Sequence, residues 1–415
     1  MARAESAVRN RSSELSQSDF ERDLHTSHQV LNMGPSHPVS HGTVKFLIEL
    51  DAENIVDLDV QVGYLHRGFE KECESGSWYQ VIPYTDRLNY NSAILCNAAF
   101  CLTVEKLLEL ESPERCQWLR VLGCELARVG DHLTRCGAAC LELAAMTPFI
   151  YGIEARELIW DLIEMLCGGR MTSNYIRIGG VKHDLPDDFG SVCRGNVARV
   201  RELLKDFDAV VTRNRIFVDR LKGTGVLSRE DCIRYSVTGP LLRAVGEPHD
   251  VRKCEPYFTY DEIDFDIPVG ETGDNYDRYL VCVEEMYQSL RIIEQCVERL
   301  EKLGPGPVNV LDPRVRWPAK GRVFGRMEEL IQQFKSVTGG PLVPAGEAYG
   351  AVESANGELG FYLVSDGTEV PWKVRCRPPS FIHMAPLPLM VKGALMADLV
   401  PTFDLVNMIG GECDR

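Results

Sequence analysis

The sequence predicts an α+β fold in which small antiparallel sheets flank a bundle of long helices. Two stretches of apolar–polar alternation, separated by a short turn, occupy residues 43–62. Segments with the 3.6-residue period of helices follow from residue 85 to residue 304, and a second strand-like stretch covers residues 349–377. Alternation with period two is typical of half-buried strands, whereas apolar residues three or four positions apart are typical of helices. Strands and helices that occur in separate runs, rather than as alternating βα units, indicate the α+β class.

Composition and charge exclude several functions. The chain has 415 residues, so we expect one large domain with added layers or two closely packed domains. A formal charge of −16 argues against a nucleic-acid partner, which would require a basic face. Fifteen cysteines without framework spacing indicate buried thiols in a reducing compartment rather than disulfides. Neither a signal peptide nor a membrane-spanning apolar run is recognisable, so we expect a soluble or peripheral protein.

The N-terminal part divides into a polar arm and a β region. Residues 1–27 are rich in Ser, Glu and Arg, and we expect a flexible arm there. The β region is expected over residues 28–84 and contains a loop, residues 32–41, with two histidines and two prolines. Because proline fixes its own φ and extends the residue before it, His37 and His41 should project from a stiff loop. From the loop alone, a surface turn with incidental histidines remains the alternative.

Two strands and a basic connector are predicted after this loop. A turn at residues 51–54 separates the strands, and residues 63–71 form the connector with His66 and Arg67. The apolar residues of the two strands are Val44, Phe46, Ile48 and Leu50, then Val56, Leu58, Val60 and Val62.

The helical core is expected over residues 85–304. Residues 86–110 are predicted to form one long helix that carries Arg87 and Tyr90. Ser112 as N-cap and Pro113 as first helical residue predict the start of the next helix, which runs to about residue 145. Further helices are predicted over residues 153–166, 187–221 and 274–303.

The helix that begins after Pro113 has a polar stripe within an arc of about 120°. Such a stripe is usually a solvated face. The small residues beside it instead suit a helix packed on both sides, where buried charges must be paired. The stripe consists of Glu125, Arg128, Asp131, His132, Arg135 and Glu142.

The last region, residues 305–415, is expected to contain a linker and an α+β unit. Glycines and prolines at 304–318 predict the linker. A short helix over 327–337, a hairpin turn at 365–367 and a final helix over 387–399 are predicted after it.

Several motifs distributed along the chain occur together, and they are highly specific as a set. The motifs are Gly34-Pro35-Ser36-His37-Pro38, His41-Gly42, Gly63 to Lys71 (GYLHRGFEK), Tyr84 to Tyr90 (YTDRLNY), Met146-Thr147-Pro148-Phe149, Asn174 to Val181 (NYIRIGGV), Glu353-Ser354, Gly357-Glu358-Leu359-Gly360, Ser365-Asp366-Gly367, Pro379-Ser380-Phe381 and Asp414-Arg415. In these motifs the chain resembles the D subunit of proton-pumping NADH:quinone oxidoreductase, respiratory complex I, over about residues 30–415.

This resemblance implies a fold like that of the nickel-iron hydrogenase large subunit, from which the family descends, and a quinone-reduction site. By match to the family motifs, His41 and Tyr90 hold the quinone headgroup, with His37 beside them, and the loop of the β region is the quinone-site loop. An imidazole with a pKa near ~6.5 and a phenol near ~10 can both donate protons to reduced quinone. Arg87 and Arg67 are expected near an iron–sulfur cluster held by the partner B subunit.

Two positions depart from the family pattern. Glu142 stands where relatives usually have an aspartate that pairs with the histidine matching His41, so we expect it within hydrogen-bonding reach of His41, directly or through one water, with His132 or Arg135 as fallback partners. Glu142 would then start a proton signal towards the membrane arm. Thr172 stands where many relatives have a histidine close to the partner's cluster, and threonine does not titrate.

Two rival functions follow from the same ancestry. A hydrogen-activating metalloenzyme would need two Cys-x-x-Cys pairs, because its nickel-iron site requires four thiolates. The chain instead has Asn89 with Ser92, and Ile409 with Glu412, while only Cys413 stands near the second pair. Cys136 and Cys140, four apart on a helix, are expected to be apolar filler. The other rival is a scaffold subunit that merely shapes a cavity for its neighbours.

The resemblance also implies partners and a location. We expect the chain to work only within the complex, against the B, C and membrane-arm H subunits, as a peripheral protein on the cytoplasmic side of the inner membrane. It carries no G-x-G-x-x-G dinucleotide motif and no iron–sulfur cysteine run, so NADH oxidation should take place in another subunit. Quinone is the expected substrate, and no metal or other cofactor is expected in this chain.

Overall fold

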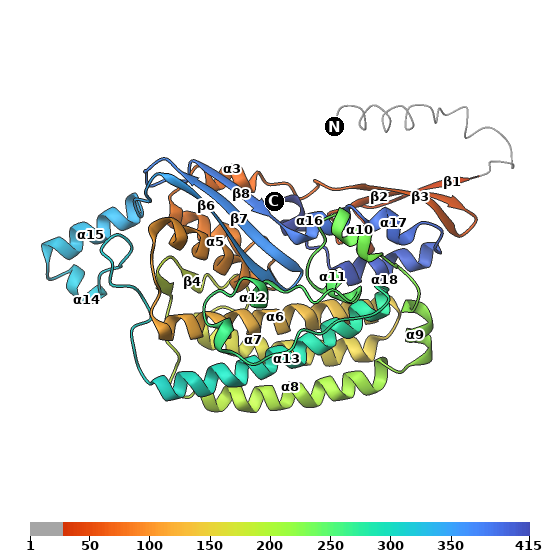
Figure 1. The fold of residues 1–415 in the computed structure, drawn as a ribbon, viewed down its shortest axis with the longest axis horizontal. Helices are drawn as coiled ribbons and strands as arrows, with labels where there is room; N and C mark the ends of the chain where they lie inside the picture. The colour runs from red at the N-terminus through yellow and green to blue at the C-terminus, as the bar shows by residue number, and fades with distance from the viewer. Residues whose placement is uncertain (1–27) are drawn as a thin grey trace.

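The computed structural model describes residues 28–415, and its mixed α+β architecture confirms the predicted fold class. The predicted arm, residues 1–27, lies outside the described residues. The N-terminal elements are β1 (Gln29–Met33), η1 (Pro38–Ser40), β2 (Lys45–Asp51), β3 (Asn54–Gln61), α3 (Phe69–Cys73) and α4 (Trp78–Thr85). β1, β2 and β3 form an antiparallel sheet in chain order, so the loop with the histidines connects β1 to β2 (Figure 1).

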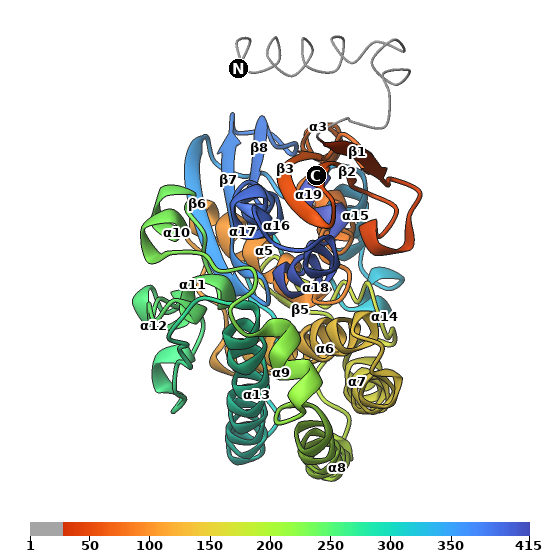
Figure 2. The ribbon, with the colours of Figure 1, turned by 90° about the vertical axis from the view of Figure 1, so that its right-hand side faces the viewer.

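The middle of the chain forms the helical bundle. Helices α6, α7, α8 and α13 run along the long axis of the molecule and are seen nearly end-on in Figure 2. Its elements are α5 (Ala93–Leu108), α6 (Glu114–Glu142), α7 (Met146–Cys167), β4 (Ile176–Arg177), β5 (Gly180–Val181), α8 (Phe189–Val211), α9 (Arg215–Leu221), α10 (Arg229–Arg234), α11 (Pro240–Ala244), α12 (Val251–Cys254), η2 (Tyr260–Glu262) and α13 (Asn275–Leu303).

The C-terminal region returns to both ends of the bundle. A second antiparallel sheet, β6–β7–β8, packs on α5, while the last helices pack on the N-terminal sheet. Its elements are α14 (Lys320–Val323), α15 (Met327–Thr338), β6 (Gly346–Ser354), β7 (Gly357–Ser365), β8 (Lys373–Arg377), α16 (Pro379–Met384), α17 (Leu387–Val391), α18 (Met396–Val406) and α19 (Gly410–Asp414).

Two hydrophobic clusters hold these parts. The larger joins the bundle to the β6–β8 sheet, and the smaller joins the N-terminal sheet to α17 and α18. In the smaller cluster the ring of Phe403 on α18 meets Phe46 on β2 edge-on, with 5.2 Å between centroids. This packing brings the C-terminal helices under the histidine loop. The predicted division into four segments, 1–27, 28–84, 85–304 and 305–415, stays a prediction.

The polar stripe of α6 is packed on both sides, as its small neighbours suggest. Glu125, Arg128, Asp131, His132 and Arg135 are buried, and only Glu142, the last residue of α6, is exposed. Glu125, Arg128 and His132 have partners of opposite charge, whereas Asp131 and Arg135 are held by uncharged groups. For example, Glu125 accepts hydrogen bonds from Arg128 at 3.3 Å and from the hydroxyl of Tyr260 at 2.6 Å, and His132 Nε2 lies 2.8 Å from Glu285 Oε2.

Several predicted boundaries were wrong for local reasons. The helix predicted over 86–110 begins only at Ala93, because Asn89 Oδ1 accepts a hydrogen bond from the backbone N–H of Asn91 and so competes with helical bonding. Tyr90 therefore lies in a turn and not on a helix. The helix predicted over 187–221 is divided into α8 and α9, because Asn214 accepts from the N–H of Ile216 and caps a new start.

Other differences lie at helix starts and in the C-terminal region. The N-cap of α6 is Pro113, one residue later than predicted, and α7 starts seven residues earlier than predicted, at Met146. The final helix predicted over 387–399 is instead divided between two helices, α17 and α18, because residues 393–396 leave α17 and hydrogen-bond to β3 and the turn before it, with Gly393 N donating to Ile55 O at 2.7 Å. The tight turn of the second sheet lies at residues 355–356, whereas residues 366–372 make a longer connection from β7 to β8.

All fifteen cysteines are free thiols, as predicted, and only Cys254 is exposed. No helix among residues 28–415 is both long enough and apolar enough to cross a membrane.

Candidate functional site

The histidine loop holds its two imidazoles differently. His37 is the N-cap of η1, and its Nδ1 accepts a hydrogen bond from the N–H of Val39 at 3.3 Å. His41 is the C-cap of the same short helix and has a left-handed backbone with φ 53°. The hydroxyl of Ser40 is buried and donates to the carbonyl of Pro35 at 3.0 Å. The loop is therefore braced internally, and both imidazoles are exposed.

The carboxylate partner of His41 is Asp404, which sequence reasoning missed. His41 Nε2 lies 3.4 Å from Asp404 Oδ1 on α18, and the His41 ring leans on Phe403 with 5.3 Å between centroids. Asp404 is almost fully buried, and its Oδ2 has no hydrogen-bond partner among the described residues. Asp404 raises the pKa of His41 above its ordinary value, and the charge of Glu142 adds to this effect. The geometry favours an imidazolium held against a buried carboxylate.

Glu142 lies near His41 but does not pair with it directly. It makes no hydrogen bond or ion pair with another described residue, so a direct hydrogen bond between Glu142 and His41 is absent, while the expected contact through one water stays a prediction. The reason is that Asp404, which lies on α18, already contacts the imidazole of His41. Partial burial of the carboxylate first and then the charge of Asp404 raise the pKa of Glu142, whereas the imidazoles of His41 and His37 lower it. The fallback partners are engaged as well, because His132 binds Glu285 and Arg135 donates to Asn356.

Tyr90 is positioned by the residues on either side of it in the turn. Asn89 Nδ2 and Ser92 Oγ both donate to Oδ2 of the buried Asp131, each at 2.8 Å. Asn407, just after α18, donates to the other oxygen of Asp131 at 3.0 Å. One buried carboxylate of α6 thus fastens the Tyr90 turn to the end of α18, the helix that carries Asp404. Burial first and then the charge of Asp131 raise the pKa of the Tyr90 phenol.

Behind this carboxylate lies a second one, Glu412 on α19. Its Oε2 accepts from Ser380 Oγ at 2.6 Å and from Asn356 Nδ2 at 3.2 Å, and its Oε1 has no partner among the described residues. Burial raises the pKa of Glu412 to about 7, and the charge of Asp131 acts in the same direction. Asn356 also contacts Asn407, with 2.6 Å between Asn407 Nδ2 and Asn356 Oδ1. The two carboxylates therefore belong to one buried hydrogen-bond network.

The arginines and the threonine expected near a partner's cluster lie in a second group. Arg67 Nη2 donates to the carbonyl of Arg87 at 2.9 Å, and Arg87 Nη1 donates to the carbonyl of Pro83 at 2.6 Å. Thr172 lies in the loop after α7, two residues before Asn174, whose N–H donates to Asp86 at 3.3 Å. Arg67, Arg87 and the Thr172 loop thus meet around the same turn of the chain.

The residues Asp414 and Arg415 hold the connector between β3 and α3. The carboxylate of Asp414 accepts from the N–H groups of Gly63 and Leu65 at 2.9 and 2.7 Å, and its backbone carbonyl lies 2.7 Å from His66 Nδ1. An open cavity of about 400 Å³ lies here, lined by His66, Phe381 and Arg415 among others, but not by His41 or Tyr90.

All seven predicted site residues are exposed in the single chain, while the two carboxylates behind His41 and the Tyr90 turn, Asp404 and Asp131, are buried. The exposed seven are His37, His41, Arg67, Arg87, Tyr90, Glu142 and Thr172. Asp404 contacts His41, and Asp131 holds the turn that carries Tyr90.

Two of the residues missed by sequence reasoning left a signal. Asp404 is the single charged residue in the mostly apolar stretch of residues 399–409, and such a charge is normally paired when buried. Arg156 lies four residues before Trp160 on α7, and its guanidinium stacks over that ring at 4.1 Å. The positive charge of Arg156 lowers the pKa of Tyr90, against the effect of burial.

Comparisons with known proteins agree with the motifs in the sequence. A family model described as "Respiratory-chain NADH dehydrogenase, 49 Kd subunit" matches residues 142–415. The NADH-quinone oxidoreductase D subunit numbered 1 of Anaeromyxobacter dehalogenans (strain 2CP-C) is 52% identical over 390 residues, which cover 94% of this chain and 90% of that protein. The NADH-quinone oxidoreductase D subunit of Myxococcus xanthus (strain DK1622) is 50% identical over 399 residues, covering 96% and 95%.

A third relative is longer. The NADH-quinone oxidoreductase C/D subunit of Bdellovibrio bacteriovorus (strain ATCC 15356 / DSM 50701 / NCIMB 9529 / HD100) is 44% identical over 392 residues. The match covers 94% of this chain and 70% of that protein.

Proposed function

The chain belongs to the family of the 49 Kd or D subunit of respiratory NADH-quinone oxidoreductase, complex I, and from this premise we propose that it forms the surface on which quinone is reduced and protonated. The observation that carries the proposal is the arrangement of His41 and Tyr90. Both side chains are exposed, yet each is tied through a short contact or turn to a buried carboxylate, Asp404 or Asp131. Exposed acids on a rigid buried support are what a proton-donating site requires.

His41 supplies the first proton under this proposal. Two-electron reduction of a quinone creates two oxyanions, and each must take up one proton to give the quinol. Because Asp404 raises the pKa of His41, the imidazole holds a proton over a wider pH range than a free histidine. It releases that proton only to a group that is more basic, such as a quinol oxyanion. Asp404 then retains the neutral ring in place.

Tyr90 supplies the second proton. Its raised pKa keeps the phenol protonated until an oxyanion forms next to it. The side chain has no hydrogen-bond partner among the described residues, so its hydroxyl is available to a headgroup oxygen. The nearby charge of Arg156 favours the tyrosinate that remains after transfer, because an opposite charge stabilises the ionised form.

Electrons enter, in this proposal, from an iron–sulfur cluster of the neighbouring B subunit. The group of Arg67, Arg87 and Thr172 is the part of the surface that would face it, since two fixed positive charges there favour the reduced, more negative cluster. The exposure of all seven predicted site residues supports a site that is completed by a second protein.

The partner subunits, the location and the link to proton translocation are also part of the proposal. The C subunit is a further partner, supported by the fused C/D name of the Bdellovibrio relative. The membrane-arm H subunit is the remaining expected partner. The chain would lie peripherally on the cytoplasmic side of the inner membrane, be inactive by itself, and pass the change in charge at His41 through Glu142 towards proton translocation.

The test compares two hydroxyl deletions in the complete membrane-bound enzyme. Tyr90→Phe removes the proposed donor, and Tyr84→Phe removes the same group from a tyrosine six residues earlier with similar exposure, 42% against 45%. We expect Tyr90→Phe to lower NADH:quinone turnover about a hundredfold, the lower range for loss of a positioned acid, while Tyr84→Phe stays near the wild-type rate.

NADH oxidation with an artificial electron acceptor that bypasses the quinone site serves as the assembly control. It should be equal in both variants. If Tyr90→Phe keeps its quinone turnover, the chain is a scaffold at this position and the proposed proton donor is wrong.

A further inference from the structure

Helix α15 is amphipathic, but its apolar side faces outwards and its polar side faces the protein, unlike the helices of the bundle. At 100° per residue, its five large apolar side chains fall within an arc of about 120°. All five are between 48% and 70% exposed, and no residue of α15, every one of which is described, is buried. These residues, here called the α15 stripe, are Met327, Leu330, Ile331, Phe334 and Val337.

The polar side of α15 faces the protein. Glu329, Gln332, Gln333 and Ser336 lie opposite the α15 stripe and are each partly covered. The side-chain amide of Gln332 donates to the carbonyls of Pro313 and Arg316 at 3.1 and 2.8 Å, which fixes the rotation of the helix. A helix of a free-standing protein turns its apolar side inwards. The orientation of α15 is therefore that of a helix whose apolar side meets another molecule.

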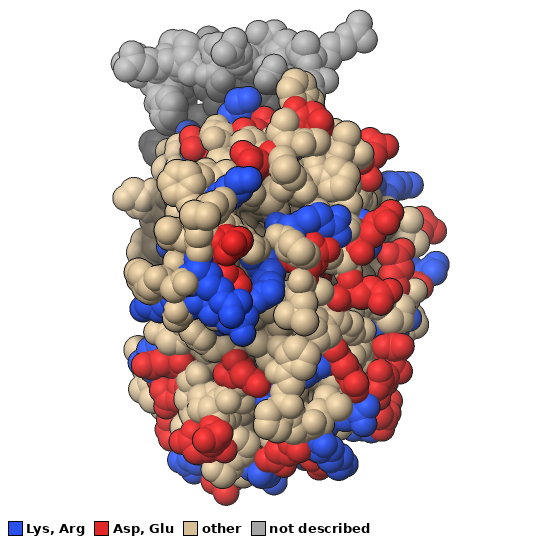
Figure 3. Space-filling model, turned by 90° about the vertical axis from the view of Figure 1, so that its left-hand side faces the viewer, with Lys and Arg blue, Asp and Glu red and all other residues tan. Residues whose placement is uncertain are grey.

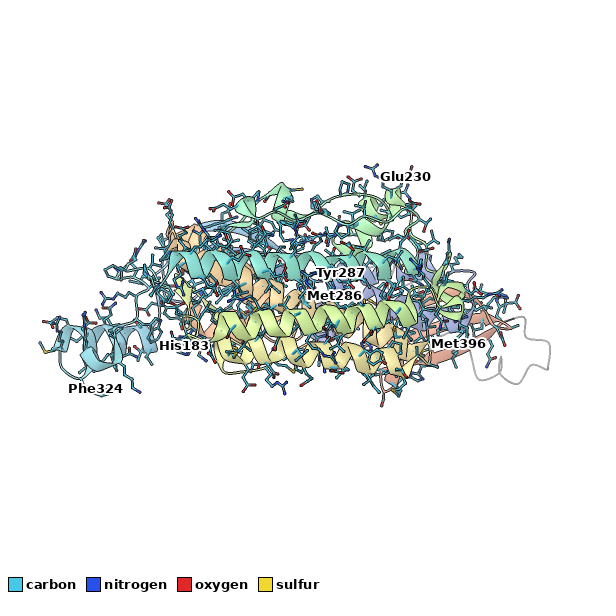
Figure 4. All side chains as sticks on the ribbon, turned by 90° about the horizontal axis from the view of Figure 1, so that it is seen from below. His183, Glu230, Met286, Tyr287, Phe324 and Met396 are labelled. Atoms are coloured by element: carbon cyan, nitrogen blue, oxygen red, sulfur yellow. The ribbon has the colours of Figure 1, made fainter. Side chains whose placement is uncertain are left out.

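The position of the stripe makes it accessible. Helices α14 and α15 project from one end of the molecule, away from the bundle (Figure 1). Phe324, in the turn between them, is 85% exposed and lies at the extreme end of the structure in Figure 4. The α15 stripe and Phe324 thus form a group of exposed apolar side chains, rather than single ones scattered over the surface. Contiguous exposed apolar patches mark interaction sites.

The charge around the stripe differs from that of the whole chain. Residues 312–335 contain six basic and three acidic side chains, so this segment is net positive in a chain of charge −16. Lys320, Arg326 and Lys335 make no ion pair with another described residue. Figure 3, which views this end, shows a group of Lys and Arg side chains beside uncharged surface. Unpaired positive charge at the rim of an apolar patch complements a partner with carboxylates at its own rim.

We propose that the α15 stripe docks into an apolar groove, flanked by carboxylates, on another protein subunit of the same enzyme. The anchors at positions 327, 330, 331, 334 and 337 follow the i, i+3, i+4, i+7 spacing of a helix that lies in a groove. Family relatives are named as subunits, so such neighbours exist for them. This inference is independent of the proposed quinone chemistry.

The charges disfavour the other occupants. A second copy of the chain would place the same unpaired basic side chains against each other across a two-fold axis, which costs free energy. An anionic lipid surface would meet Glu328, an exposed carboxylate in the first turn of α15 beside the stripe. A protein groove with an apolar floor and carboxylates at its edges complements both the α15 stripe and the unpaired cations beside it.

A photo-crosslink in the complete enzyme tests the proposal. A benzophenone amino acid at position 334, the centre of the stripe, is activated in purified complex, and the attached peptide is identified by mass spectrometry. We expect attachment to a different subunit, at an apolar segment with flanking Asp or Glu. Attachment to lipid, to a second copy of this chain or to a Lys- and Arg-rich peptide, or no attachment at all, would overturn it.

A charge substitution gives the second readout. Phe334→Asp should lower the yield of assembled complex at least tenfold, because a carboxylate cannot enter an apolar groove next to others. The matched control is Ile216→Asp on α9, since Ile216 is a single apolar residue that is 72% exposed, against 67% for Phe334. The control should change the yield less than twofold. Equal yields for the two variants would count against docking through the stripe, provided that circular dichroism shows both chains folded.

Discussion

Glu412 makes a quantitative prediction about pH and stability. The side chain is fully buried, accepts two neutral hydrogen bonds and has no cation as a direct partner among the described residues. Burial raises its pKa from an ordinary 4.5 to about 7. The folded chain therefore binds this proton more tightly than the unfolded chain does. The corresponding stability is fully present below pH 4.5 and is lost as the pH rises through about 7.

The size of the effect follows from the two pKa values. Each tenfold change in proton affinity is worth about 1.4 kcal/mol, so the rise from 4.5 to about 7 corresponds to about 3.5 kcal/mol over the whole pH range. Glu412→Gln keeps the shape and an acceptor for Ser380 but cannot ionise. Part of this change lies below pH 5, so relative to the wild type the variant should gain about 2.5 kcal/mol of unfolding free energy between pH 5 and pH 8.

Urea unfolding of the purified subunit at pH 5, 6, 7 and 8 measures this difference. The quantity of interest is the variant minus the wild type, because other titrating groups then cancel. Glu328→Gln, which removes an exposed carboxylate from α15, is the control and should give a difference that does not change with pH. A constant difference for Glu412→Gln, or one that falls with pH, would refute the argument that a neutral Glu412 is the stable buried form.

Three further predictions concern the site and its support. Asp404→Asn removes the charge that raises the pKa of His41, so the alkaline fall of kcat/KM for quinone should move to lower pH; an unmoved limb would mean that His41 is not the titrating donor. Because Thr172 does not titrate, the reduction potential of the partner's cluster should hardly change between about pH 6 and 8. In Thr172→His the potential should fall with rising pH by up to roughly 60 mV per unit. Equal slopes for the wild type and the variant in a redox titration followed by electron paramagnetic resonance would contradict this. Gly411→Ala would put a methyl group well inside van der Waals contact with the carbonyl oxygen of Arg87, so the unfolding free energy should fall by about 1–3 kcal/mol, and unchanged denaturation would show that α19 can move away freely.

The sequence could predict what is encoded locally. Alternation identified β2 and β3 because Phe46, Ile48 and Leu50 all face one side of a sheet. The small neighbours of the α6 stripe correctly indicated a helix packed on both sides. The motifs selected His41 and Tyr90 as site candidates, and the structure leaves their chemical roles as proposals.

The sequence could not predict contacts between distant segments. Nothing near His41 reveals that its carboxylate partner is Asp404, because the contact depends on how α18 packs on the N-terminal sheet. The sequence predicted Tyr90 on a helix because residues 86–110 are apolar enough to continue one. The helix is interrupted there because the N–H of Asn91 donates to the Asn89 side chain instead of to a helical carbonyl, and one such hydrogen bond is not visible in the sequence pattern. The orientation of α15 was equally hidden, since a helical pattern does not say which side meets the protein.

The contacts of Asp414 have a consequence for the order in which the molecule is made. Its carboxylate binds the N–H groups of Gly63 and Leu65, which precede it by 351 and 349 positions. Asp404 reaches back to His41 over a comparable distance. A ribosome delivers the histidine loop and its connector early, and both must wait without their partners until the last helices emerge. The site therefore matures late in synthesis, and a shortened chain that ends before α18 should leave the imidazole of His41 without the carboxylate that tunes it.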